Sequence, residues 1–385
     1  MLFNIADKNA KTFCLLYIKN SKYNMKTIQI TFVILFFLFV NSLLLNAQTV
    51  YHKASEFPLL GKITNETETR YERLPAYLKD KVSRPAIWSL GKNTSGLIIR
   101  FNSNSTSISA KWEVLEDVRM NHFTETGIKG LDLYAWENNK WQFVNTARPT
   151  GKESEQMIIS TMTAKNREFM LFLPLYDGLT GLSIGVDSLS TITKPQTNLV
   201  ATKNPIVVYG TSITQGGCAT RAGMSYTNIL TRWMNREFIN LGFSGNGQLD
   251  YEIADVMAKR KDAALFILDF IPNVTEEKIK DRTKNFVNII RKENPNTPIL
   301  LVESIIFPHS VFSTETANIL SVKNNALRAE YEEMKKNGDK NLYYLNSNNL
   351  MNEDGEGTVD GIHLTDLGFQ FIAKALQKEI NCIVP

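Results

Sequence analysis

Cysteine and histidine are both scarce in this sequence. Its 385 residues include three cysteines and four histidines. Neither Cys218 nor Cys382 has a partner at the spacing of a metal-binding motif, and no other cluster of ligand residues stands out. We therefore expect neither a metal nor an organic cofactor. A disulfide between these two cysteines and a pair of free thiols are both compatible with the sequence.

One long apolar run lies near the N-terminus. Residues 30–45, ITFVILFFLFVNSLLL, follow Lys22 and Lys26 and are followed by the small residue Ala47. This order predicts a secretory signal peptide that is cleaved near Ala47. An uncleaved anchor helix is the alternative, although the run is slightly short of the roughly 20 residues that a spanning helix needs.

Positive and negative charges are balanced in the rest of the chain. We expect translation to start at Met25, so that residues 1–47 comprise an over-extended start and the signal peptide. Their loss removes five lysines and one aspartate, after which basic and acidic side chains are equal in number. A neutral protein exerts no long-range attraction on polyanions. We therefore expect a secreted or periplasmic protein with a small or uncharged substrate and no nucleic acid partner.

The first half of the chain contains short apolar runs separated by glycine, asparagine and aspartate. Strands at this spacing, with no long helical window, predict a β-sandwich or jelly-roll domain, which we place at residues 48–192. The runs are Gly96–Phe101, Ser107–Trp112, Gly130–Trp136, Gln156–Ile159 and Glu168–Leu173.

Four tryptophans accompany these runs: Trp88, Trp112, Trp136 and Trp141. Flat sugar faces pack on indole rings, so a sugar-stacking platform is one interpretation. We favour the other, in which the four side chains belong to the core or rim of the sandwich.

The second half alternates between strand and helix patterns. After a polar linker at residues 193–204, a domain at residues 205–385 contains five apolar runs and five helical windows. This alternation predicts a parallel sheet covered by helices on both faces, with ligands bound at the carboxyl ends of the strands. The runs are Ile206–Tyr209, Phe238–Leu241, Ala263–Leu268, Ile299–Val302 and Leu342–Leu345; the windows are Ser225–Arg236, Tyr251–Arg260, Glu276–Lys292, Glu315–Lys336 and Thr365–Glu379.

Ser212 lies on a glycine-flanked turn directly after the first of these strands. Such a turn can present a hydroxyl group at the sheet edge, although small residues after a strand are also common for backbone reasons. The sequence differs from the nucleophile elbow of the α/β-hydrolases, because Thr214 stands where that motif has its second glycine.

Asp360 and His363 lie three residues apart, just before the last helix. A carboxylate at this spacing can orient an imidazole while the other ring nitrogen takes a proton from serine. The alternative is that Asp360 caps a turn and His363 is a surface residue. His363 is the best candidate base, because His52 and His122 lie outside the α/β half and His309 has no acidic neighbour in sequence.

Two further strand ends offer donors for the oxyanion that forms when a carbonyl is attacked. The glycine-rich segment 240–247 follows the second strand, and its backbone N–H groups can approach a ligand closely. Asn273 follows the third strand and could donate its side-chain amide. Each segment taken alone is more often an ordinary loop.

Together these four segments resemble the SGNH (GDSL-type) hydrolases over residues 206–380. The resemblance implies a three-layer, flavodoxin-like parallel sheet and a triad of Ser212, Asp360 and His363. It also implies an oxyanion hole formed by Ser212, Gly245 and Asn273, and it implies no cofactor.

Two positions depart from the pattern of that family. The first block usually has aspartate where Thr211 stands, at a position that is not catalytic in the family. The third block, Gly-x-Asn-Asp in the family, reads Ile271–Val274 here. The second departure makes Asn273 the less secure assignment.

The sequence therefore predicts a secreted serine esterase that forms an acyl-serine intermediate and releases a short acid, acetate above all. A sandwich ahead of an SGNH domain resembles secreted bacterial carbohydrate acetylesterases, which implies an acetylated glycan as substrate. We expect the segment 304–314 to narrow the acyl pocket, although it could be an ordinary connection. A lipase or thioesterase of the same family and a non-enzymatic glycan-binding protein are the alternatives, and the oligomeric state stays open.

Overall fold

The computed structural model describes residues 48–195, 200, 203–348, 350–351 and 354–384. Residues 49–385 form one compact unit. The predicted signal peptide lies outside the described residues, as does part of the predicted linker. No helix within the described ranges is long and apolar enough to cross a membrane. The exact boundaries between the two halves stay a prediction.

The first half is a sandwich of two antiparallel sheets, which confirms the expected architecture. Apolar side chains of both sheets, including Phe101, Trp112 and Leu133, pack between them. The four-stranded sheet has the order β1 (Thr49–Lys53), β9 (Leu179–Asp187), β4 (Ile108–Val114) and β7 (Glu153–Ile159). The six-stranded sheet has the order β10 (Ile192–Thr193), β3 (Ile98–Ser103), β8 (Arg167–Phe172), β5 (Leu131–Glu137) and β6 (Lys140–Ala147), with β2 (Leu59–Leu60) paired to β3.

Short helices lie between these strands: η1 (Ala54–Glu56), η2 (Ala76–Leu78), α3 (Pro85–Gly91) and α4 (Glu125–Ile128). The segment that contains η2 and α3 does not pack in the sandwich. Its apolar side chains Ile63, Leu74, Leu78 and Ile87 join the core of the α/β half. Trp88 also packs against that core, whereas we had expected it in the sandwich.

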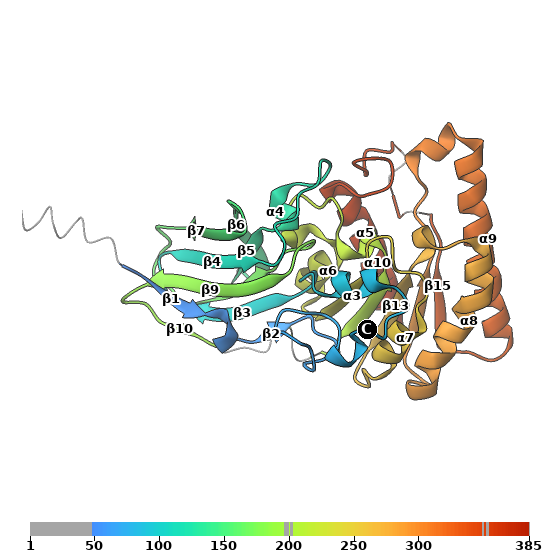
Figure 1. Cartoon of the computed structure of the whole chain (residues 1–385), viewed down its shortest axis with the longest axis horizontal. Helices are drawn as coiled ribbons and strands as arrows, with labels where there is room; N and C mark the ends of the chain where they lie inside the picture. Colours follow the sequence, from blue (N-terminus) through green and yellow to red (C-terminus); the bar gives the residue numbers. More distant parts are fainter. Residues whose placement is uncertain (1–47, 196–199, 201–202, 349, 352–353, 385) are drawn as a thin grey trace, which may run out of the picture. The chain divides into compact units, whose positions relative to one another are not determined.

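The second half is a parallel five-stranded sheet, of which β13 and β15 are labelled in Figure 1. Its strands have the order β12-β11-β13-β14-β15. Strand β11, the second from the edge, pairs with β12 on one side and with β13 on the other. This is the flavodoxin-like order that the family resemblance implies. The strands are β11 (Ile206–Gly210), β12 (Phe238–Gly242), β13 (Leu265–Asp269), β14 (Ile299–Val302) and β15 (Leu342–Leu345).

Helices cover both faces of this sheet and produce the three layers that the sequence predicts. Helices α7, α8 and α9 contribute to the apolar cluster on one face, and α6 and α10 contribute to the cluster on the other. The helices are α5 (Ser212–Gln215), η3 (Ala222–Met224), α6 (Tyr226–Met234), α7 (Tyr251–Ala258), η4 (Ile271–Asn273), α8 (Glu276–Glu293), η5 (Pro308–Val311), α9 (Thr314–Lys336) and α10 (Asp366–Ile383).

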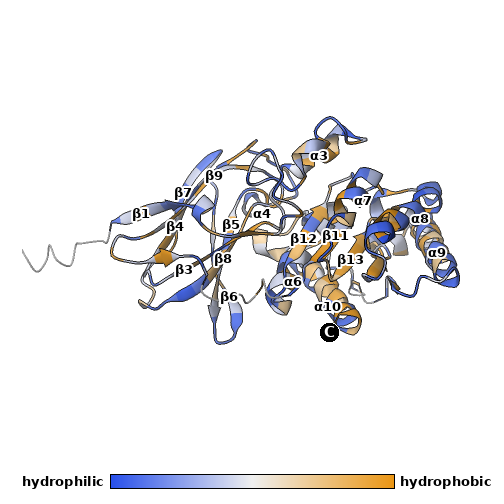
Figure 2. Ribbon diagram, turned by 90° about the horizontal axis from the view of Figure 1, so that it is seen from below, coloured by the Kyte–Doolittle hydropathy of each residue, from blue (hydrophilic) through white to orange (hydrophobic). Residues whose placement is uncertain are grey.

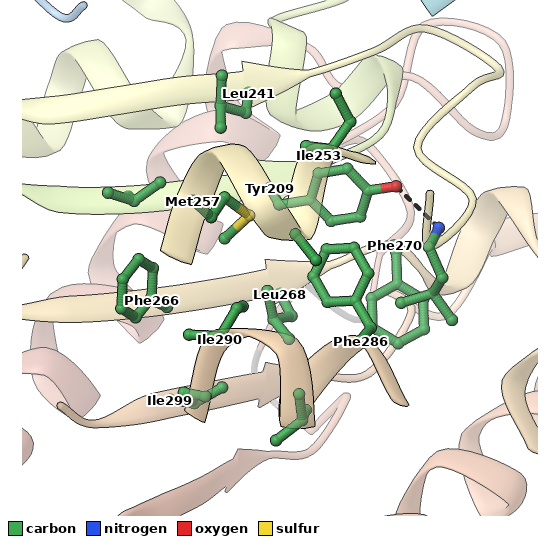
Figure 3. Packing of buried hydrophobic residues seen from close by; sticks show 14 of the residues in the cluster. Tyr209, Leu241, Ile253, Met257, Phe266, Leu268, Phe270, Phe286, Ile290 and Ile299 are labelled. Carbon is green, nitrogen blue, oxygen red and sulfur yellow. Dashed lines mark hydrogen bonds between the residues drawn. The ribbon is translucent and has the colours of Figure 1, made fainter. Parts of the chain in front are cut away.

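The strands of this sheet are mostly apolar (Figure 2), with Asn240 in β12 and Asp269 at the end of β13 as polar exceptions. All five residues of β11 are buried, as are those of β12 and β13. A parallel sheet that is covered on both faces requires such continuous runs rather than alternation. Figure 3 shows Tyr209, Phe266 and Leu268 packing against Met257 of α7 and Phe286 of α8. The central strands are therefore fixed from both sides, and with them the positions of their carboxyl ends.

Candidate active site

Ser212 is the first residue of helix α5, immediately beyond the carboxyl end of β11. The hydroxyl of Thr211 caps this helix by accepting from the N–H of Ile213 at 3.2 Å. A side chain at Gly210 would place its Cβ 2.0 Å from the hydroxyl oxygen of Thr214, so only glycine allows the helix to start this close to the strand. Ser212 is 7% exposed, at the base of the sheet edge rather than on the open surface.

Asp360 and His363 lie on one tight loop before α10, and each oxygen of the carboxylate has its own partner. Oδ1 accepts from the backbone N–H groups of Ile362 (3.0 Å) and His363 (2.8 Å), while Oδ2 lies 2.7 Å from Nδ1 of His363. Gly361 has a φ of +87°, a conformation that glycine adopts without strain. The two interpretations of Asp360, as the cap of a turn and as the carboxylate partner of His363, are therefore compatible.

The loop brings the imidazole to the serine, 151 positions away in the sequence. Nε2 of His363 lies 3.0 Å from Oγ of Ser212, which completes a hydrogen-bonded series of carboxylate, imidazole and hydroxyl. Partial burial raises the pKa of Asp360, but the hydrogen bonds from His363 and Ile362 outweigh it and lower the pKa to about 2. A carboxylate that stays ionised can orient the ring and stabilise its positive form.

The proposed oxyanion donors lie at the adjoining strand ends. The turn after β12 places Gly245 at a φ of +67° with open space beside its α-carbon. This turn lies directly against the end of β11, because the N–H of Phe243 donates to the carbonyl of Gly210 at 3.0 Å. The backbone N–H groups of Gly245 and Ser212 are therefore at the same edge of the sheet.

Asn273, in η4 after β13, lies against the same turn. Its amide oxygen can accept from the N–H groups of Asn246 and Gly247, each at 3.2 Å. The structure thus brings Asn273 to the turn that carries Gly245, although its sequence block departs from the family pattern.

Several residues that support this site could not be recognised in the sequence. Gln215 of α5 accepts from the N–H of Ser244 (2.9 Å) and donates to Asn93 (3.0 Å), which joins the nucleophile helix to the oxyanion turn and to the first half. The guanidinium of buried Arg73 lies 5.1 Å from the ring centre of Phe243 and donates to the carbonyls of Asn240 and Gly242. Neither Gln215 nor Arg73 belongs to a local motif, so only the folded chain identifies them.

The sandwich half also contributes residues beside the triad. The hydroxyl of Tyr176 donates to the carbonyl of Ser212 at 3.2 Å. The ring of His122, which the sequence analysis set aside as a base, lies 5.7 Å from the ring of His363. Scarcity of histidine was the one signal that could have drawn attention to His122.

The two cysteines are free, which settles the alternative left open by the sequence. Cys382 is exposed, whereas Cys218 is buried beside the triad. Burial, and then the negative charge of Asp360, raise the pKa of the Cys218 thiol to about 12. A thiol that stays protonated at neutral pH does not compete with Ser212 as a nucleophile.

The segment 304–314 lies beside the catalytic loop, and its role in narrowing an acyl pocket stays a prediction. A side chain at Gly361 would come within 2.9 Å of the His309 ring, so the two loops are in contact. The His309 ring in turn stacks on Phe307 at 5.8 Å. Val311 and Phe312 are 81% and 91% exposed and face solvent. These two side chains therefore do not narrow a pocket.

Comparisons with known proteins identify the family of this chain. Residues 203–381 match the GDSL-like Lipase/Acylhydrolase family, and residues 49–192 match the N-terminus of Esterase_SGNH_hydro-type proteins. A protein of Bacteroides ovatus assigned as a GDSL-like lipase is 38% identical, with a TM-score of 0.83 over 87% of this chain and 98% of its own. The chain therefore belongs to the GDSL-like lipase/acylhydrolase family and is an esterase-type hydrolase.

More distant structures share the fold. A salicylyl-acyltransferase from a tetracycline biosynthetic pathway is 17% identical, with a TM-score of 0.70 over 88% of this chain and 99% of its own. A family two carbohydrate esterase from Clostridium thermocellum, in complex with cellohexaose, is 13% identical, with a TM-score of 0.57 over 87% and 98%. No curated protein matches the chain significantly.

The arrangement of Asn273 leads to a first prediction. Asn273→Ala should lower kcat by roughly a hundredfold to a thousandfold with little change in KM, because an oxyanion donor acts on charge that develops in the transition state. Steady-state kinetics on a nitrophenyl ester would measure both constants. Asn285→Ala, which removes an exposed amide on α8, is the control and should leave both unchanged. A change in KM alone would place Asn273 in substrate binding instead.

Asp269 leads to a second prediction, on stability. Its buried carboxyl group ends β13 and accepts from the hydroxyls of Tyr226 (2.9 Å) and Thr214 (3.0 Å). Burial raises the pKa of Asp269 to about 7, although these two hydrogen bonds lower it. Between about pH 4 and about pH 7 the carboxyl group of Asp269 is therefore protonated in the folded protein and ionised in the unfolded chain. The contribution of this group to the free energy of unfolding is fully present below about pH 4 and is lost as the pH rises through about 7.

Relative to Asp269→Asn, which cannot ionise, the wild type should lose up to about 4 kcal/mol of unfolding free energy between about pH 4 and about pH 8. Urea unfolding of both proteins across this range would measure the difference. Asp255→Asn, on the exposed face of α7, is the control for a surface carboxylate. A wild type to Asp269→Asn difference that is constant with pH would show that Asp269 is already ionised in the folded protein.

Proposed function

We propose that this esterase hydrolyses short-chain esters, acetyl esters of carbohydrate in particular, through an acyl-serine intermediate. The observation that carries the proposal is the hydrogen-bonded series from Asp360 through His363 to Ser212 at the carboxyl edge of the sheet. In this proposal the chain acts outside the cytoplasm, as the apolar run at residues 30–45 suggests.

The proposed reaction has two steps. Nε2 of His363 takes the proton of Ser212 as Oγ attacks the ester carbonyl, and the oxyanion is held by the N–H groups of Ser212 and Gly245 and the amide of Asn273. The same imidazole then gives that proton to the departing alcohol. In the second step His363 takes a proton from water as its oxygen attacks the acyl group. The imidazolium then returns that proton to Oγ of Ser212 as the acid is released, which restores both residues. Asp360 stays ionised throughout and stabilises the imidazolium.

The choice of a carbohydrate substrate rests on weaker support than the choice of chemistry. The carbohydrate esterase that binds cellohexaose shares the two-part fold at low identity, and likeness at that level concerns architecture alone. Of the tryptophans, Trp112 and Trp141 are buried in apolar clusters of the first half, so neither forms a sugar-stacking platform.

One observation favours a second candidate, a lipase-type hydrolase. Apolar side chains are exposed on and beside the catalytic loop: Val359 is 46% exposed and Ile362 38%, and Phe312 of the neighbouring segment is almost fully exposed. Exposed apolar groups beside a triad can accommodate a long acyl chain. The two candidates share the triad and differ in the acyl group.

The triad assignment is tested by substitution. Ser212→Ala and His363→Ala should each lower kcat/KM by at least about a thousandfold while leaving the fold intact, because each removes a group on which the other depends. Ester hydrolysis together with circular dichroism would measure both effects. His309→Ala, in the loop that contacts Gly361, is the matched control and should stay close to the wild type. Residual activity within about tenfold for Ser212→Ala, or severe loss for His309→Ala, would refute the assignment.

The acyl group is tested by chain length. Acetyl nitrophenyl esters should exceed octanoyl esters by about tenfold or more in kcat/KM, because a pocket that excludes extra methylenes penalises them sterically. Acetylated oligosaccharides should release acetate under the same conditions, measured by an enzyme-coupled assay. Equal or faster turnover of the octanoyl ester would reject the deacetylase proposal and favour the lipase.

A further inference from the structure

Three side chains from parts of the chain that are far apart in sequence lie close together at the triad. His122 belongs to the loop between β4 and α4, Cys218 follows helix α5, and His363 lies on the catalytic loop. One ligand atom from each of these residues lies within 4.8 Å of the other two. The esterase reaction described above uses only His363 of the three.

Both imidazoles are held in the manner of metal ligands. Nδ1 of His363 is hydrogen-bonded to Asp360 at 2.7 Å, and Nδ1 of His122 lies 3.1 Å from the side-chain oxygen of Asn121. An oxygen acceptor on Nδ1 fixes the proton there and leaves the lone pair of Nε2 available. Protein-bound zinc commonly has histidine ligands oriented by such a carboxylate or carbonyl oxygen.

The geometry requires a small closing movement. A tetrahedral zinc site with two nitrogen ligands and one sulfur ligand has edges of about 3.5 Å, whereas the three atoms here lie within 4.8 Å of one another. Cys218 is held in a left-handed conformation (φ +71°) and is 4% exposed, so its thiol is fixed. The His122 side chain is exposed, and rotation about its side-chain bonds can bring its ring inward. A metal can also reach the site from solvent past this residue.

We propose that Zn²⁺ binds to His122, Cys218 and His363 and switches the esterase off. Two imidazole nitrogens and one thiolate form a donor set that suits Zn²⁺ and does not suit Mg²⁺ or Ca²⁺, which prefer oxygen. The thiol releases its proton when the metal binds. The fourth position is left for water. Because the lone pair of His363 Nε2 then belongs to the metal, it can no longer accept the proton of Ser212.

Esterase assays with added metal test the proposal. Zinc chloride at micromolar concentration should inhibit the wild type at least about tenfold, EDTA should restore activity, and equal concentrations of Mg²⁺ or Ca²⁺ should have no effect. Cys218→Ser and His122→Asn should keep near wild-type activity without zinc and require at least about tenfold more zinc for half inhibition. His309→Ala, a histidine beside the catalytic loop but outside the cluster, is the control and should remain zinc-sensitive.

Cobalt absorption tests the binding independently of catalysis. The inhibition assay rests on the proposed role of His363 as the base, whereas a thiolate-to-Co²⁺ charge-transfer band requires only that the metal binds Cys218. The band should appear in the wild type and in inactive Ser212→Ala, and it should be lost in Cys218→Ser and in the second variant Cys218→Ala. The proposal fails if the wild type shows no band, or if zinc inhibits Cys218→Ser and His122→Asn as strongly as the wild type.

Discussion

The position of strand β11 between β12 and β13 in the parallel sheet is the constraint on which the site depends. Hydrogen bonds to β12 and β13 hold it on both sides, and in that register Gly210 lies opposite Gly242 and Asp269. All three strands therefore end at one level. The nucleophile helix, the oxyanion turn and η4 start from these ends, so the sheet determines their relative positions before any side chain of the site makes a contact.

The first half of the chain takes part in this constraint through a buried guanidinium. Arg73 is 1% exposed, and its hydrogen bonds go to backbone carbonyls: those of Leu90 and Asn93 in its own segment, and those of Asn240 and Gly242 at the end of β12. Burial lowers the pKa of Arg73 to about 9 despite the opposing influence of Tyr176, so the cation persists at neutral pH. A charge that is compensated by carbonyl dipoles binds the segment between β2 and β3 to the strand that carries the oxyanion turn.

The sequence predicted those parts of the structure that depend on residues close together in the chain. Continuous apolar runs mark buried parallel strands, and helical windows such as Glu276–Lys292 correspond to α8 (Glu276–Glu293), so the three-layer fold was recognisable. The contact between Ser212 and His363 could be anticipated because each residue lies in a short motif at a strand or loop end. The roles of Arg73 and His122 could not, since each acts on a partner more than 160 positions away through no local pattern. The packing of the segment around α3 could not be predicted for the same reason. The pattern of its apolar residues indicates that they are buried, but it does not indicate which sheet they pack against.

The catalytic loop shows how a contact across 151 positions is kept within hydrogen-bonding distance. Asp360 uses one carboxylate oxygen to hold the turn of its own loop and the other to hold the ring of His363. Turn shape and ring orientation therefore depend on a single residue, and neither needs the substrate to form. The position of the loop as a whole is fixed by two further contacts. An isolated β-bridge between Thr358 and Leu364 closes the loop, and the buried side chain of Leu364 packs in the apolar cluster that includes α10. The orientation of the imidazole is thus set within its own loop, and its position is set by the packing of that loop on the fold. For this reason a loop of a few residues is sufficient to bring the base to the serine at the edge of the sheet.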